Sequence, residues 1–254
     1  MDKEEFQLLV NFHKDNKRQG PGSSRATKRA LSFLGMDEKK KLEIADIGCG
    51  TGSQTITLAK NTNSHITAVD LSYDFLEKLK TRAGDLNLDH QITTRENSMD
   101  NLPFETKNFD IIWSEGAIYI MGFENGIRYW KKFLKNEGYL VVSDICWFTN
   151  SRPLELEKYW NQEDVEISTP AQKLQLFEEN GCSPIAYFQL PEYCWLKEYY
   201  KPIEDNFQSF LAAHNYSKTA RAIVDQMKQE IEMYNKYKKY YGYGFFIAKK
   251  RRSY

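Results

Sequence analysis

The 254-residue sequence lacks long hydrophobic runs and lacks an excess of either charge. No apolar stretch reaches the roughly 18 residues that a membrane-spanning helix needs, and the charged N-terminus is unlike a secretory signal. Lys and Arg together number 35, as do Asp and Glu, so no net positive field attracts nucleic acid or an anionic membrane. We therefore expect a soluble, cytoplasmic protein with no nucleic-acid or membrane partner.

The sequence also lacks the spacings that mark metal sites and redox motifs. The cysteines form no C-x-x-C pair, and no histidine has a metal-like partner four residues further on. We expect reduced intracellular thiols and no metal. The cysteines are Cys49, Cys146, Cys182 and Cys194, and the histidines are His13, His65, His90 and His214.

The most informative stretch that is present is Ile44–Gly52, which joins an apolar run and one acid to glycines at alternate positions. It predicts a buried strand that enters a turn passing very close to a ligand, because glycine has no Cβ and tolerates a positive φ. Residues 53–60 then form a predicted helix. A strand, a glycine turn and a helix N-terminus together make the nucleotide-binding corner of an α/β sheet.

The spacing of the glycines argues against a dinucleotide. The dinucleotide fingerprint G-x-G-x-x-G fails here, because Ser53 or Thr55 occupies the position of the third glycine. A second predicted strand, 65–70, ends in Asp70, which lies 18 residues after Gly52. An acid at that separation is typical of a contact to ribose hydroxyls.

These motifs resemble class I S-adenosylmethionine-dependent methyltransferases of the small-molecule (ubiquinone/menaquinone-type) branch. The resemblance is carried by residues 46–52, 68–70, 97–104 and 108–113. It implies that the glycine turn contacts the methionine part of the cofactor, Asp70 the ribose, and Ser98 with Met99 the adenine. Many relatives have aspartate where this chain has Ser98, so either the serine hydroxyl accepts from the adenine or the contact passes to Met99 or Asp100. The implied cofactor-binding set is Asp46, Gly48, Gly50, Gly52, Asp70, Leu71, Ser98, Met99 and Ser114.

Alternating strands and helices predict an α/β fold with a parallel sheet covered on both faces. The resemblance implies a doubly wound, mostly parallel seven-stranded sheet whose last strand is antiparallel. Expected strands are 43–47, 65–70, 91–96, 109–114, 138–145, 184–190 and 244–248, and expected helices are 4–13, 23–34, 53–60, 72–83, 123–135 and 170–180.

We expect a single methyltransferase domain over residues 1–254. Its parts are an N-terminal helical lid (1–35), a nucleotide-binding core (36–190), a helical cap inserted between the last two strands (191–241), and the last strand with a basic tail (242–254). The cap is predicted because the roughly 50 residues between the last two strands are too many for a normal hairpin loop. Its sequence predicts two helices separated by a break near residues 214–217.

Methyl transfer from a sulfonium is an in-line displacement, so the protein must mainly align the acceptor and exclude water. The resemblance places Glu115 and Tyr119, after the fourth strand, near the reacting methyl group as candidate catalytic residues. Glu115 could instead cap a helix or contact the cofactor, and Tyr119 could be a packing residue. Residues 18–23 are a candidate cofactor-covering lid, while His13 is expected at the surface.

Aromatic residues of the later half are candidates for the wall of a substrate cavity. In the cap they could stack on a flat or cationic substrate, and the alternative is ordinary packing of the cap on the sheet. Asp144 is expected to be structural. The candidate cavity residues are Trp147, Tyr193, Trp195 and Tyr200, with Tyr199 beside them.

The leading functional hypothesis is an S-adenosylmethionine-dependent methyltransferase that releases S-adenosylhomocysteine and acts on a small molecule. Neutral charge and a closing cap argue against polymer substrates, and residues 113–116 lack the N-P-P-Y-type tetrapeptide of DNA-methylating relatives. Two alternatives stay open: a non-catalytic cofactor-binding regulatory module, and a nicotinamide-dependent oxidoreductase. The acceptor and the oligomeric state stay open as well.

Overall fold

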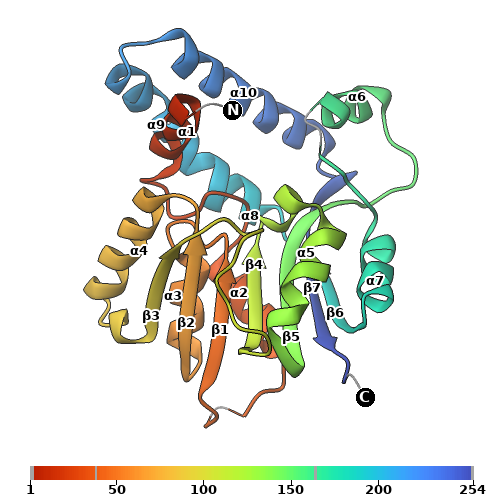
Figure 1. The fold of residues 1–254 in the computed structure, drawn as a ribbon. Coiled ribbons are helices and arrows are strands. Elements are labelled where there is room, and N and C mark those ends of the chain that lie inside the picture. Colours follow the sequence, from red (N-terminus) through yellow and green to blue (C-terminus); the bar gives the residue numbers. More distant parts are fainter. Residues whose placement is uncertain (1–2, 38, 163–164, 253–254) are drawn as a thin grey trace.

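A seven-stranded sheet organises the structure, a computed structural model that describes residues 3–37, 39–162 and 165–252 (Figure 1). The strand order is β3-β2-β1-β4-β5-β7-β6, and only β7 runs antiparallel to its two neighbours. This confirms the predicted doubly wound sheet with an antiparallel last strand. The strands are β1 Leu42–Ile47, β2 Ser64–Asp70, β3 Ile92–Glu96, β4 Phe109–Glu115, β5 Leu134–Trp147, β6 Cys182–Gln189 and β7 Tyr241–Lys250.

Both faces of the central strands are buried, as the continuous apolar runs predicted. Along β4, Ile111 and Trp113 contribute to one hydrophobic cluster and Ile112 to another, because successive side chains point to opposite faces. β7 alternates in the same way at Phe245 and Phe246.

Helices cover each face of the sheet. The cluster on one face includes side chains of α2, α3 and α4, and the cluster on the other includes side chains of α5 and α7 (Figure 1). The helices are α1 Lys3–His13, α2 Ser24–Ser32, α3 Ser53–Asn61, α4 Tyr73–Asp85, α5 Phe123–Trp130, α6 Leu154–Gln162, α7 Pro170–Glu179, α8 Tyr193–Trp195, α9 Lys201–Ala213 and α10 Lys218–Tyr237.

A further layer of helices lies across the carboxyl ends of the parallel strands, where Figure 1 shows α1 beside α9 and α10. The Phe12 ring of α1 lies 4.8 Å from the Phe210 ring and 6.1 Å from the Phe207 ring of α9. Asn206 donates a hydrogen bond of 3.2 Å to Asn16. The N-terminal segment and the insertion before β7 therefore form one roof, although they are far apart in the sequence.

The structure differs from the expected elements in a few places. α5 ends at Trp130 and passes through a 3-10 turn into β5, which begins at Leu134 rather than residue 138. The helix α6 was not anticipated. Tyr241, placed in the cap by sequence, is the first residue of β7. The break between α9 and α10 is where it was expected, and Asn215 and Tyr216 have positive φ there.

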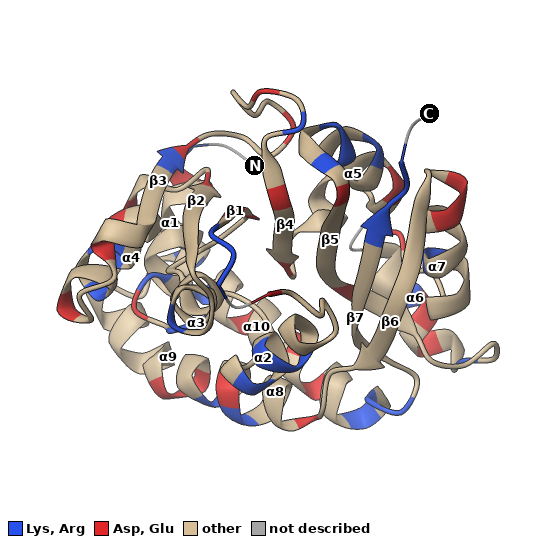
Figure 2. Ribbon diagram, turned by 90° about the horizontal axis from the view of Figure 1, so that it is seen from below, with Lys and Arg blue, Asp and Glu red and all other residues tan. Residues whose placement is uncertain are grey.

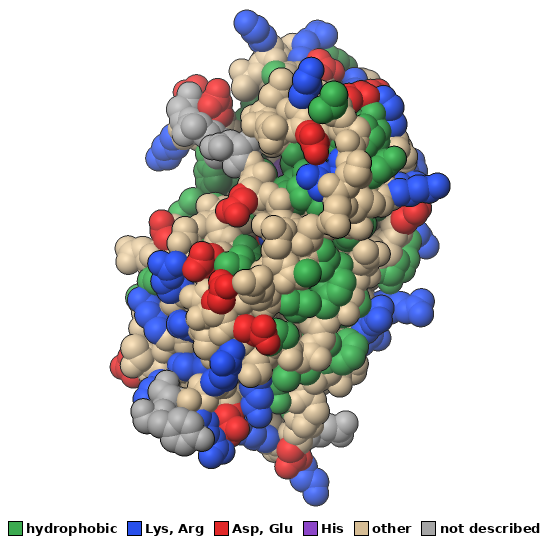
Figure 3. Space-filling view, turned by 90° about the vertical axis from the view of Figure 1, so that its right-hand side faces the viewer, with side chains coloured by type: hydrophobic (Ala, Val, Ile, Leu, Met, Phe, Trp, Pro, Cys, Tyr) green, Lys and Arg blue, Asp and Glu red, His purple; other side chains and the backbone are tan. Residues whose placement is uncertain are grey.

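The surface shows no segregation of charge. In Figure 2, Lys and Arg are interspersed with Asp and Glu along the outer helices. Figure 3 shows a band of hydrophobic side chains on the side of the molecule that carries the outer strand β6, with charges of both signs around it. Over the described ranges no helix is long and apolar enough to cross a membrane, and no cluster of three or more His, Cys, Asp or Glu is arranged to hold a metal. All four cysteines are buried and free.

Candidate active site

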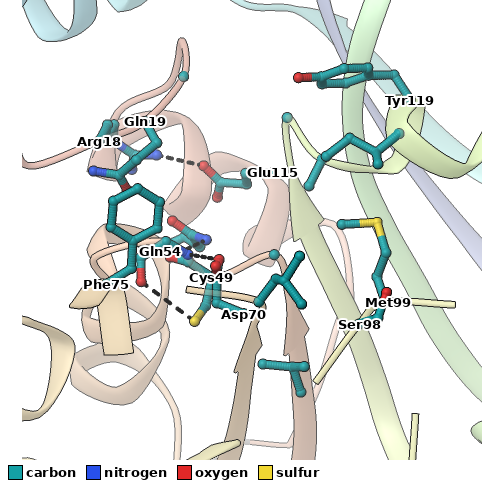
Figure 4. Close-up of a pocket in the computed structure, with 18 of the residues that line it drawn as sticks. Arg18, Gln19, Cys49, Gln54, Asp70, Phe75, Ser98, Met99, Glu115 and Tyr119 are labelled. Atoms are coloured by element: carbon teal, nitrogen blue, oxygen red, sulfur yellow. Dashed lines mark hydrogen bonds and ion pairs between the residues drawn. The ribbon is translucent and has the colours of Figure 1, made fainter. Parts of the chain in front are cut away.

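A cavity of about 500 Å³ opens at the carboxyl ends of β1, β2 and β4 (Figure 4). We call it the main cavity. In Figure 4, Arg18, Gln19 and Phe75 lie across it from Met99 and Tyr119. Such a position, outside the strand ends where the sheet order reverses, is where open α/β sheets bind ligands.

The glycine turn forms the floor of the main cavity at Gly48 and Gly50, with φ of 71° and 55°. A Cβ on Gly48 would lie 2.5 Å from the Ala117 Cβ, and one on Gly50 would lie 2.2 Å from the Gln19 Oε1. Gly52 lies outside the cavity lining, and a Cβ there would lie 2.1 Å from a Leu79 methyl group of α4. A Cβ at any of the three glycines would therefore clash with a neighbouring side chain, which explains why glycine occupies all three positions.

Asp70 ends β2 at the rim of the main cavity. One carboxylate oxygen accepts a hydrogen bond from the Gly50 N–H at 2.8 Å, and the other accepts from the Ser72 N–H at 3.0 Å. Burial raises the pKa of Asp70, and these backbone donors oppose that rise. The next residue, Leu71, is 56% exposed and lines the same rim.

The wall on the β3 side combines polar and apolar groups. Asn97, Ser98 and Met99 line it after β3, and Phe75 of α4 lines the opposite side. The Met99 carbonyl accepts a hydrogen bond of 2.9 Å from the Trp130 indole, which fixes this loop to α5.

Besides Gly52, two more of the predicted cofactor residues, Asp46 and Ser114, lie outside the lining of the main cavity. Asp46 is fully buried and accepts hydrogen bonds from the Thr55 hydroxyl at 2.5 Å and from Gln54 at 3.4 Å. Burial raises the pKa of Asp46 to about 7, and the Glu115 and Asp70 carboxylates add to that rise. Ser114 is fully buried, and its hydroxyl has no hydrogen-bond partner in the described part of the chain.

Glu115 ends β4 with both carboxylate oxygens engaged. Oε2 forms an ion pair of 2.8 Å with Arg18, whose side chain is 7% exposed against 3% for Glu115. Oε1 accepts hydrogen bonds from the Thr27 hydroxyl at 2.6 Å and from the Trp113 indole at 3.0 Å. The end of β4 is thereby tied to the N-terminal segment.

The lid segment, residues 18–23, lies against the glycine turn. Gln19 accepts a hydrogen bond of 2.9 Å from the Thr51 N–H and donates to the His13 and Asn16 carbonyls. Arg18, Gln19, Gly20 and Pro21 line the main cavity. The segment therefore covers the turn.

A second cavity of about 280 Å³ adjoins the main cavity and shares residues 19–21, Gly116 and Tyr119 with it. We call it the aromatic chamber. Burial raises the pKa of the Tyr119 phenol, with smaller contributions from the Glu230 and Asp144 carboxylates. Its aromatic lining consists of Tyr119, Tyr159, Trp160, Trp195, Tyr199 and Tyr243.

Of the four candidate cavity residues, Trp195 lines the chamber and Tyr200 donates a hydrogen bond of 2.9 Å to Glu230. Trp147 lies outside both linings, with the Arg152 guanidinium 4.4 Å above its ring. The Tyr193 hydroxyl lies 3.2 Å from the Ser23 hydroxyl and faces a separate groove.

His13 and Asp144 line neither the main cavity nor the aromatic chamber. The His13 ring packs against Phe12 and Tyr199, so the expectation of a surface histidine was wrong. Asp144 is fully buried in an ion pair with Lys173 of α7. That pair joins β5 to a helix on the opposite face from the cap, which agrees with a structural role.

Several site residues carried no signal in the sequence. Gln54 lines the main cavity from the first turn of α3, and Glu230 lines the chamber from α10. Glu230 lies in a helix with many charged residues, and only its position beside the cap aromatics distinguishes it. Tyr243 reaches the chamber because β7 inserts next to β5.

Comparison with known proteins shows what this chain resembles in sequence and in fold. The family model described as "Methyltransferase domain" matches residues 44–138, which include the glycine turn, β2 and β4. A SAM-dependent methyltransferase from Geobacter sulfurreducens, solved with S-adenosyl-L-homocysteine, superposes with a TM-score of 0.82 at 16% identity, covering 98% of this chain and 99% of that chain. The chain therefore shares its fold with this SAM-dependent methyltransferase, and its residues 44–138 match the methyltransferase domain model.

Two curated relatives match part of the chain. An uncharacterised protein of Haemophilus influenzae is 28% identical over 170 residues, covering 65% of this chain and 66% of the relative. A phosphoethanolamine N-methyltransferase of Plasmodium falciparum is 28% identical over 128 residues, covering 49% and 46%. This chain thus spans less than two thirds of the length of these relatives.

Proposed function

We propose that this protein is an S-adenosylmethionine-dependent methyltransferase that acts on a small molecule. The observation that carries the proposal is the junction of two cavities, since the main cavity and the aromatic chamber share Gly116, Tyr119 and part of the lid segment. In-line transfer requires donor and acceptor side by side in a fixed orientation. Two adjoining cavities under one roof supply that arrangement.

The lining of the main cavity fits the cofactor. Gly48 and Gly50 would hold the methionine part, because both line the cavity with backbone that carries no side chain. Asp70 would accept hydrogen bonds from the ribose hydroxyls, and Leu71, Ser98 and Met99 would enclose the adenine. The bound sulfonium supplies the methyl group and most of the driving force.

The remaining residues position the substrates and exclude water. Glu115 has both oxygens engaged, so in this proposal it holds the lid segment through Arg18 and takes no proton from the acceptor. The raised pKa keeps the Tyr119 phenol neutral, and it orients the acceptor by a hydrogen bond. Asp46, Gly52 and Ser114 support the turn and the strand ends from below.

Calorimetry with S-adenosylhomocysteine tests the cofactor assignment. We expect Asp70→Ala to weaken binding by at least about tenfold, since it removes charge-assisted acceptors from the rim. Asp85→Ala, an exposed position at the end of α4, is the matched control and leaves binding unchanged. Undiminished binding by the Asp70 variant contradicts the assignment.

Turnover separates catalysis from mere binding. Labelled S-adenosylmethionine incubated with a metabolite pool is expected to pass its methyl group to a small molecule. Binding without transfer favours the regulatory module, and preferential binding of a nicotinamide cofactor favours the oxidoreductase.

A further inference from the structure

The wall of the aromatic chamber is rich in aromatic side chains. Its six aromatic residues come from the β4 loop, α6, the cap and β7, so four separate segments present ring systems to one volume of about 280 Å³. The rings also pack on one another: Trp195 lies 5.0 Å from Tyr243, edge to face. Aromatic faces carry negative partial charge and attract cations.

The charge in the chamber has one sign. Glu230 is the one charged residue in the described lining, which contains neither Lys, Arg nor His. The Tyr200 hydroxyl donates to Glu230 Oε1 at 2.9 Å and holds the carboxylate at the wall. The one basic residue in the described lining of the main cavity, Arg18, is already paired with Glu115.

The tyrosines around Glu230 remain uncharged. Burial raises the pKa of Tyr199 and Tyr243 well above the usual tyrosine value, and the Glu230 carboxylate raises both further. Neutral phenols add no charge of their own, so the carboxylate supplies the one formal charge in the described lining.

We propose that the chamber receives an amine acceptor, and that the ring faces with Glu230 stabilise positive charge on its nitrogen. This inference rests on the function proposed above. It also commits to an acceptor without a phosphate or other strongly anionic group, because such a group would lie beside Glu230 with no cation to pair with it.

The chemistry agrees with this charge pattern. The neutral amine nitrogen donates its lone pair to the methyl carbon, an N–C bond forms, and the C–S bond breaks with its electron pair passing to sulfur. Positive charge moves from sulfur to nitrogen, and an ammonium product that carries N–H releases its proton to water on leaving. Glu230 and the rings lie where the charge develops, which favours the transition state over the neutral amine.

The name of the relative from Plasmodium falciparum suggests a comparison between amine acceptors with and without a phosphate. That protein is named as a phosphoethanolamine N-methyltransferase, whose acceptor name includes a phosphate. The described chamber lining of the present chain offers a phosphate no basic side chain. In this proposal the present chain methylates an amine, as that relative is named for doing, but does not accept an amine that carries a phosphate.

Three probes test this without requiring turnover. With the protein saturated by S-adenosylhomocysteine, calorimetry compares choline, its neutral carbon analogue 3,3-dimethylbutan-1-ol, and phosphocholine. We expect choline to bind about tenfold or more tightly than either of the others. Equal binding of choline and the neutral analogue, or tighter binding of phosphocholine, overturns the inference.

Variants localise the effect. Glu230→Gln keeps an oxygen to accept from Tyr200 and is expected to abolish the preference for choline over the neutral analogue. Glu232→Gln, exposed on the same helix, is the matched control and keeps the preference. Equal losses in the two variants overturn the inference.

Binding of S-adenosylhomocysteine serves as the folding control in both variants. The same measurement distinguishes failure of the proposed function from failure of the amine assignment. If the unsubstituted protein does not bind S-adenosylhomocysteine, the proposed function is wrong. If it binds S-adenosylhomocysteine but does not prefer choline over the neutral analogue, only the amine assignment is wrong.

Discussion

Single residues at the glycine turn decide whether a ligand can reach the main chain. Gly48 combines a positive φ of 71° with a neighbour, Ala117, that has no rotatable side chain to move aside. The alternate glycines in the sequence predicted a close approach here. The partner that a Cβ would meet follows from the fold, because Ala117 belongs to the loop after β4.

Replacing Gly48 by Ala is expected to weaken binding of S-adenosylhomocysteine by about tenfold or more. The added Cβ must displace Ala117 or the turn, and the left-handed backbone also costs about 1 kcal/mol for any residue with a Cβ. Calorimetry measures the affinity and urea unfolding measures the stability.

Gly181 provides the matched control for this change. Its φ of 75° is close to that of Gly48, but a Cβ there would meet nothing within 4 Å. Gly181→Ala should therefore lose stability through backbone strain alone and keep full affinity. Similar affinity losses in both variants would mean that strain, and not space at the cavity floor, governs binding.

At the scale of elements, one buried ion pair fastens the N-terminal segment to the end of β4. Arg18 and Glu115 are almost fully buried, so either charge left alone would be poorly solvated. The pair works with Gln19, which bridges the segment to the glycine turn at Thr51. The sequence suggested a lid at residues 18–23 and a functional Glu115, without indicating that the two contact each other.

Arg18→Met is expected to destabilise the protein by about 3 kcal/mol, because it leaves Glu115 buried without its cation. Hydrogen exchange of the α1 amides should accelerate, and binding of S-adenosylhomocysteine should weaken. Adding Glu115→Gln to this variant should recover part of the stability. Arg25→Met, at an exposed position of α2, is the control, and unchanged α1 exchange in the Arg18 variant would refute the fastening role.

At the scale of the whole molecule, stability depends on buried titratable groups with opposite responses to pH. Burial lowers the pKa of His13 to about 4, so the folded state keeps it neutral while the unfolded state protonates it near pH 6.5. Stability from His13 is therefore present above pH 6.5 and lost as the pH falls toward 4. Asp46 acts in the other direction, because its raised pKa favours the folded state at low pH.

Comparing wild type with His13→Leu isolates the first of these effects, since both proteins contain Asp46. Between about pH 7.5 and about pH 5, wild type should lose about 2 kcal/mol more unfolding free energy than the variant. Urea unfolding at the two pH values measures this difference. Parallel pH profiles would show that His13 is protonated equally in the folded and unfolded states.

The mostly parallel seven-stranded sheet and the antiparallel β7 agree with the expectation from the sequence. The parallel sheet follows from the alternation of strands and helices along the sequence, and the antiparallel last strand was implied by the family resemblance. The short α6 was missed because residues 148–165 carry neither a clear apolar period nor an obvious cap. The start of β5 was missed because its first residues, Leu134–Glu137, are largely polar.

The sequence by itself determined the sheet, the glycine turn and Asp70 at its rim, because each depends on neighbouring residues or on one strand–helix–strand unit. Only the tertiary structure decided which distant groups meet. Folding of the roof over the strand ends brings Arg18 to Glu115 and pairs α1 with α9. It also gathers Tyr119, Trp195, Tyr243 and Glu230 around one chamber. Contacts between segments far apart in the sequence leave no local pattern, so the chamber and its charge could be found only in the folded chain.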